Sequence, residues 1–215
     1  MLLDERPRTK PRLRGVSHQI AFVVAIGLGV ALISDAHGAR PRVAAAVFAG
    51  SVAAMFGASA LYHRVDWSPP RRRWMRRLDH AMIYALIAGT YTPFGLLVLH
   101  GTWRIVVLAI VWSGAAVAVT LKLFWVDAPK WLAAVVGISL GWVGVLVAPQ
   151  LADAVGASGL ALLLAGGVAY TAGAVIYALR RPDPIPAVFG YHELFHALVI
   201  AAVGLQYSVV AFYVL

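Results

Sequence analysis

Residues 191–215 read YHELFHALVIAAVGLQYSVVAFYVL, and after His196 this C-terminal stretch carries no charged side chain. An apolar run of about 20 residues is long enough to cross the hydrocarbon core of a bilayer as a helix. Six further runs of this kind precede it, at about 17–34, 43–62, 78–99, 105–125, 131–148 and 158–179. The pattern therefore predicts an all-α protein, a bundle of seven transmembrane helices.

The composition indicates the same class. Of 215 residues, 61% are hydrophobic and only 13% are charged, which is more apolar than a soluble domain. We expect one membrane domain at 16–215, preceded by a flexible basic tail at 1–15. The first run, 17–34, also has an alternative interpretation as a signal peptide, because small residues follow it. The chain has no cysteine, so a metal ion would have to be bound by His, Asp, Glu or water.

The basic residues predict how the chain is oriented. Seven spans place the two termini on opposite sides of the membrane. With the N-terminus inside, the tail and the loops at 63–77, 122–130 and 180–190 hold all but three of the 18 Lys and Arg residues. The positive-inside rule then predicts a cytoplasmic N-terminus and an extracytoplasmic C-terminus. The net charge of +9 is explained by these loops rather than by nucleic-acid binding.

Two histidines begin the last span. His192 and His196 are four residues apart, so on a helix they share a face and can bind one metal ion. In the predicted topology His63 ends the second span at the same depth, and three imidazoles with one water form the usual catalytic zinc site. Four other histidines near span ends are expected to be interfacial residues: His18, His37, His80 and His100.

Two more polar residues belong to this depth. Asp79 begins the third span, and Ser59 lies one helical turn before His63. Zinc lowers the pKa of a bound water to about 7. Asp79 would hold that water as general base and later protonate a leaving amine. Ser59 would donate a hydrogen bond either to a metal-bound oxygen or to the oxyanion of the tetrahedral intermediate. The set predicts hydrolysis of a carbonyl compound whose apolar body lies in the bilayer.

A second interpretation starts from Glu193. The sequence His192-Glu193-x-x-His196 matches the zincin pattern, in which the glutamate is the general base and the substrate is a peptide bond. An intramembrane zinc protease is therefore an alternative. The two interpretations differ in whether Asp79 or Glu193 is the essential carboxylate.

Three ordered motifs resemble a known family. Ser59-x-x-x-His63, the stretch LDHAMIYALIAGTYTPF at 78–94, and His192-Glu193-Leu194-Phe195-His196 are similar to those of the bacterial hemolysin III proteins. These are relatives of the progestin and adipoQ receptors and, more distantly, of the alkaline ceramidases. The resemblance implies a seven-helix fold with zinc near the cytoplasmic face, bound by the three histidines.

The resemblance also bears on single residues. It implies that Asp79 holds the zinc-bound water and that Ser59 lies beside it. Relatives can carry Gln at position 193, which argues against Glu193 as the base. This chain departs from the family at Gln206, where relatives often carry His, and the departure would matter if that position shapes the cavity.

The expected function is hydrolysis of a lipid amide bond by a Zn²⁺ enzyme of the bacterial inner membrane. The substrate would be an N-acyl or sphingolipid-like membrane lipid, as for a ceramidase. The alternative is a non-enzymatic protein with structural zinc, receptor-like or active in membrane homeostasis. Hemolysis is a weaker form of this alternative, because the sequence shows no amphipathic pore-forming segment.

Overall fold

The computed structural model describes residues 10–215, and positions 1–9 of the predicted tail lie outside this part. Within it the chain forms helices and turns but no strand, so the all-α prediction is confirmed. Short irregular helices interrupt or end the long ones at Phe94–Val98, Val143–Val147 and Val210–Val214. The long helices are α1 (Val16–Asp35), α2 (Ala39–Arg64), α3 (Pro69–Pro93), α4 (Gly101–Phe124), α5 (Lys130–Gly141), α6 (Ala148–Leu179) and α7 (Tyr191–Val209).

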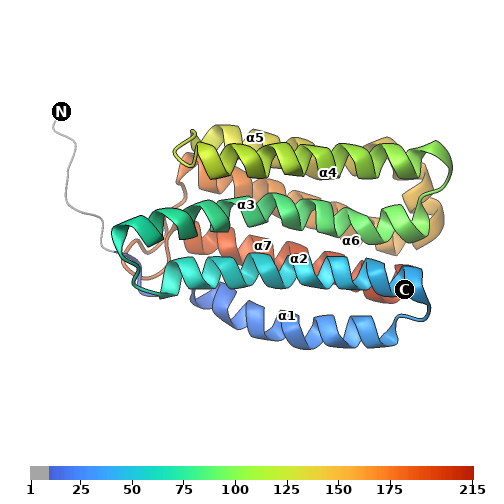
Figure 1. The fold of residues 1–215 in the computed structure, drawn as a ribbon, viewed down its shortest axis with the longest axis horizontal. Coiled ribbons are helices and arrows are strands. Elements are labelled where there is room, and N and C mark those ends of the chain that lie inside the picture. Colours follow the sequence, from blue (N-terminus) through green and yellow to red (C-terminus); the bar gives the residue numbers. More distant parts are fainter. Residues whose placement is uncertain (1–9) are drawn as a thin grey trace.

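The long helices lie side by side in one elongated bundle (Figure 1). Helices that follow one another pack together, as α1 with α2, α2 with α3 and α3 with α4. Helix α7 packs against α6 and also contacts α1, which closes the bundle. The end of α2 and the beginnings of α1, α3 and α7 therefore meet at one end, on the left of Figure 1.

Six stretches are long and apolar enough to cross a membrane. Large apolar side chains point outward from them, for example Val23 on α1 and Val117 on α4, which are 68% and 60% exposed. Several polar side chains point inward instead, among them Ser59, Asp79 and His196. This arrangement suits a lipid surround, and the chain is a multi-pass membrane protein.

The longest of the six stretches, Lys130–Leu179, contains 50 residues. One unbroken helix of that length would extend about 75 Å, more than twice the thickness of a hydrocarbon core. The backbone does not continue as one helix. A 3₁₀ segment follows α5, and within α6 Gly156 has a φ of 64° and a ψ of −177°. Glycine adopts this positive φ without strain. The chain on the two sides of the interruptions packs together, α5 against α6.

Candidate metal centre

Three histidines meet at the end of the bundle where α2 ends and α7 begins. The side chains of His63, His192 and His196 are buried, and one ring nitrogen of each lies within 4.8 Å of the others. The Nε2 atoms of His63 and His192 are 3.1 Å apart. Two nitrogens bound tetrahedrally to one zinc ion are separated by about 3.3 Å, as follows from Zn–N bonds of about 2.0–2.1 Å. The spacing thus fits two ligands of a single ion.

The hydrogen bonding of His196 agrees with this fit. Its Nδ1 is buried and has no hydrogen-bond partner among residues 10–215. An unpaired polar atom in such a place is costly, and a metal ion can use the free nitrogen. Three imidazoles without a thiolate are a donor set that suits zinc. The three histidines can therefore hold a metal ion.

Glu193, the base of the zincin interpretation, has a different position. Its side chain is 1% exposed, and its Oε1 accepts an ion-paired hydrogen bond from Arg14 Nε. Its Oε2 accepts from the backbone N–H of Gly190 at 2.9 Å, which caps the start of α7. Both oxygens are engaged at the helix terminus, and Glu193 is not among the residues lining the cavity described below.

The last residues before α1 cover this end of the bundle. The backbone N–H groups of Arg12 and Leu13 donate to the carbonyls of Ala187 and Val188, at 3.0 and 3.1 Å. Gly15 has a φ of 80°, and a side chain there would collide with the Cβ of His63. The described part of the predicted tail, 10–15, is thus bonded to the loop before α7 and lies against a candidate ligand.

A cavity of about 220 Å³ begins at the histidines and continues between α3, α5, α6 and α7. Ser59, Asp79, His192 and His196 line it together. Asp79 is 8% exposed, and its Oδ2 lies 3.3 Å from His80 Nδ1. The structure therefore places the side chains of Asp79 and Ser59 on the wall of the same cavity as two of the histidines.

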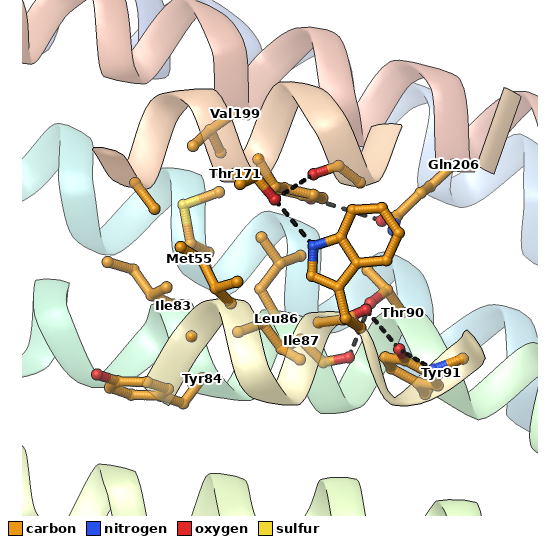
Figure 2. Close-up of a pocket in the computed structure, with 18 of the residues that line it drawn as sticks. Met55, Ile83, Tyr84, Leu86, Ile87, Thr90, Tyr91, Thr171, Val199 and Gln206 are labelled. Atoms are coloured by element: carbon orange, nitrogen blue, oxygen red, sulfur yellow. Dashed lines mark hydrogen bonds between the residues drawn. The ribbon is translucent and has the colours of Figure 1, made fainter. Parts of the chain in front are cut away.

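The rest of the cavity is mainly apolar. Figure 2 shows its walls, with Met55, Ile83, Leu86 and Val199 lining it. Gln206 also lines the cavity and accepts a hydrogen bond of 3.5 Å from Tyr170 Oη. The position at which the resemblance implies a departure from the relatives thus lies on the cavity wall.

One residue of the site was not recognised from the sequence. His18 was expected at the interface, but it is 2% exposed and lines the cavity. Its ring stacks on that of His196, with centroids 3.7 Å apart and 7° between the planes, and its Nδ1 lies 2.8 Å from Ser59 Oγ. The available signal was its place in the first turn of an apolar run, at the same end as the other three histidines.

The other three single histidines differ among themselves. His37 and His100 are exposed, in agreement with an interfacial position. His80 is partly buried, lines the cavity, and bonds to Arg76 O at 2.7 Å and to Tyr177 Oη at 3.0 Å. His80, whose Nδ1 lies 3.3 Å from Asp79 Oδ2, is thus a second cavity residue that the sequence analysis expected at the interface.

Fold and site define the class: a helical, multi-pass membrane protein with a buried three-histidine cluster at one end of its bundle. The family model described as Haemolysin-III related matches residues 7–207, and the chain belongs to this family. It is 32% identical over 203 residues to Hemolysin-3 of Bacillus cereus, covering 93% of this chain and 90% of the relative. It is 30% identical over 201 residues to the Hemolysin-3 homolog of Bacillus subtilis (strain 168), covering 92% and 91%. The resemblance found in the sequence is confirmed.

Proposed function

We propose that this protein is a zinc-dependent membrane hydrolase that cleaves the amide bond of an N-acyl lipid, as a ceramidase does. The observation that carries the proposal is the cavity, which is lined by His192, His196, Asp79 and Ser59 and has mainly apolar walls beyond them. On α3 the lining extends from Asp79 to Phe94, about 22 Å along a helix axis. Half a hydrocarbon core is about 15 Å thick, so one acyl chain can lie along the cavity with its amide at the polar end.

We also infer seven spans. The interruption at Gly156 supports dividing Lys130–Leu179 into two crossings, because the whole stretch is too long for one. With seven crossings, the distribution of Lys and Arg favours a cytoplasmic N-terminus and an outer C-terminus. The metal site then lies near the cytoplasmic face of a bacterial inner membrane.

His63, His192 and His196 would hold the zinc ion, which supplies a Lewis acid and lowers the pKa of a water molecule to about 7. Asp79 accepts the proton of the attacking water and returns it to the leaving amine. Ser59 donates a hydrogen bond to the oxyanion that develops on the acyl carbon. The apolar walls exclude other water from the acyl chain and fix its position relative to Asp79.

The test compares purified wild type with Asp79→Asn and His63→Ala. Zinc content is measured by elemental analysis, and release of fatty acid is measured from a labelled N-acyl lipid. We expect Asp79→Asn to retain zinc and lose turnover at least about 100-fold, as for loss of a general base. His63→Ala should lose both zinc and turnover. Full turnover in Asp79→Asn would refute the role of Asp79, and zinc-loaded wild type inert towards amide and ester lipids would favour a structural metal.

A second candidate function is hemolysis, because both relatives carry hemolysin names. It is tested by haemoglobin release from erythrocytes exposed to purified wild type and Asp79→Asn. Lysis that is equal in the two would separate this activity from hydrolysis. The large outward-facing apolar side chains of α1 favour a permanently embedded helix over a pore-forming segment that inserts later.

A further inference from the structure

Lys122 is a buried cation that the proposed chemistry does not use. It lies in the last turn of α4, is 6% exposed, and lines the same cavity as Asp79. Its neighbours Leu121 and Phe124 are 50% and 83% exposed, so Lys122 is on the inward face of the helix. Among residues 10–215, no carboxylate lies within ion-pair distance of its ammonium group. A lysine can stabilise the C-terminus of a helix while its side chain faces outward. Burial of the Lys122 side chain against a cavity is costly, so it needs a different explanation.

A second cation lies beside it. Arg76 lies near the beginning of the adjacent helix α3, which packs against α4. One guanidinium nitrogen, Nη2, is ion-paired with Asp127, which is 74% exposed on the loop after α4. Arg76 Nε is buried and has no hydrogen-bond partner within residues 10–215. Lys122 and Arg76 thus have unused donors, and the carboxylate that pairs with Arg76 is largely in solvent.

Both cations lie at the end of the bundle where α4 ends and α3 begins, which is also the end that holds the proposed reaction centre. Arg76 precedes Asp79 by three residues on α3, which is about 4.5 Å along the helix axis. An amide bond held at Asp79 would have its head-group side toward this end of the bundle, while the acyl chain extends the other way along the apolar walls. Charge-assisted bonds to carboxylate or phosphate are the strongest that Lys and Arg donate.

We propose that Lys122, with Arg76 beside it, binds a carboxylate or phosphate close to the amide of the lipid, so that the preferred substrates are anionic N-acyl lipids. N-acyl amino acids have this chemistry, with a carboxylate next to the amide, and N-acyl ethanolamine phosphates are the phosphate counterpart. The inference rests on the proposed hydrolase function for its kinetic readout, but the binding preference can be measured without turnover.

The kinetic test uses three lipids with the same acyl chain: N-palmitoylglycine, N-palmitoylethanolamine phosphate and neutral N-palmitoylethanolamine. Wild type should favour the anionic lipids in kcat/KM. Lys122→Met should lower kcat/KM for them at least about tenfold, as for loss of a charge-assisted hydrogen bond, and leave the neutral lipid unchanged. Lys122→Arg should restore the preference. A larger loss for the carboxylate or for the phosphate lipid tells which anion the site fits.

The matched control is Lys130→Met, the same substitution on the same side of the bundle. Lys130 donates to Tyr191 Oη at 3.0 Å and lies over the Tyr177 ring, and it does not line the cavity. This variant should keep the anionic preference. A preference lost equally in both variants would overturn the assignment to Lys122 and indicate a general effect of surface charge.

A binding measurement separates failure of this inference from failure of the hydrolase proposal. Dissociation constants for the three lipids are measured in the zinc-loaded Asp79→Asn protein, with and without Lys122→Met, or Lys122→Gln if the Met variant does not fold. Tighter binding of the anionic lipids, reduced at least about tenfold without Lys122, would support the inference even if no lipid is hydrolysed. Equal binding of anionic and neutral lipids would overturn it.

Discussion

Substitution of Glu193 is expected to destabilise the start of α7 without removing hydrolysis. In Glu193→Ala, Arg14 loses its partner and the Gly190 N–H loses its acceptor. Breaking a buried ion pair costs about 3–5 kcal/mol, and we take the lower end, about 3 kcal/mol, because Arg14 is 19% exposed and can turn to water. Loss of the cap adds about 1 kcal/mol. Glu193→Gln keeps an oxygen for Gly190 and loses only the charge, at about 1–2 kcal/mol.

These energies give measurable melting temperatures. For a chain of this size, 1 kcal/mol shifts Tm by about 2–4 °C. We therefore expect a decrease of about 8–16 °C for Glu193→Ala and about 2–8 °C for Glu193→Gln, measured by thermal unfolding in detergent. Arg14→Met should also be destabilised, and adding Glu193→Gln to it should recover part of the loss, because the unpaired buried charge is then removed.

Zinc content and lipid hydrolysis are measured on the same Glu193→Gln sample. Both should remain close to wild type, whereas Asp79→Asn should keep its zinc and lose hydrolysis. A Glu193→Gln protein with normal zinc and a Tm no more than about 8 °C below wild type, but no hydrolysis, would refute this reasoning. It would assign the general base to Glu193 and restore the protease interpretation.

Two further predictions concern residues that contact the histidines. Gly15→Ala should lower both Tm and zinc content, because it combines a φ of 80° with a collision against His63. Gly101→Ala is the control, because Gly101 has a φ of 60° and open space around it. This variant should have only the backbone strain of about 1–2 kcal/mol and should keep its zinc. Equal zinc loss in the two variants would contradict a specific effect on His63. His18→Phe should keep the ring stack on His196 but lose the hydrogen bond to Ser59. In the double variant with Ser59→Ala, the two losses of hydrolysis should not add, and the coupling free energy between the two positions should be about 1 kcal/mol. Additive losses would show that the two side chains act independently.

The helices were predictable because lipid imposes a simple pattern on the sequence. Long apolar runs define where helices lie, and the structure has a helix over each predicted run. The gap between two predicted apolar runs, at 149–157, contains Gly156, where the helical backbone is interrupted. Hydropathy does not report the 3₁₀ segment after α5, since it depends on local packing and hydrogen bonds such as that from Gly144 N to Tyr91 Oη.

The convergence of the three histidines was predictable for a similar reason. The sequence shows at which end of a span each ionisable residue lies, and with antiparallel neighbours this fixes depth. It does not show which helices are neighbours around the bundle. His18 was therefore missed, because a single histidine in a first turn has the same pattern whether it faces lipid headgroups or another imidazole.

The same limit applies to the tail. A basic, proline-containing N-terminus has the composition of a flexible segment, and residues 10–15 fit that composition. Their contacts depend on the loop before α7, far away in the sequence, through backbone hydrogen bonds to Ala187 and Val188. No local pattern encodes a partner at that separation.

The geometry of the candidate metal site depends on α1 as well as on the helices that supply the three histidines. His192 and His196 are fixed relative to each other by α7, but His63 is 129 residues from His192 in the sequence, on α2. Helix α1 packs against both α2 and α7, and His18 contacts Ser59 on one and His196 on the other. Substitutions at the His18 contacts should therefore change the distance between His63 and the α7 pair, and so zinc affinity, although His18 itself is not one of the three ligands.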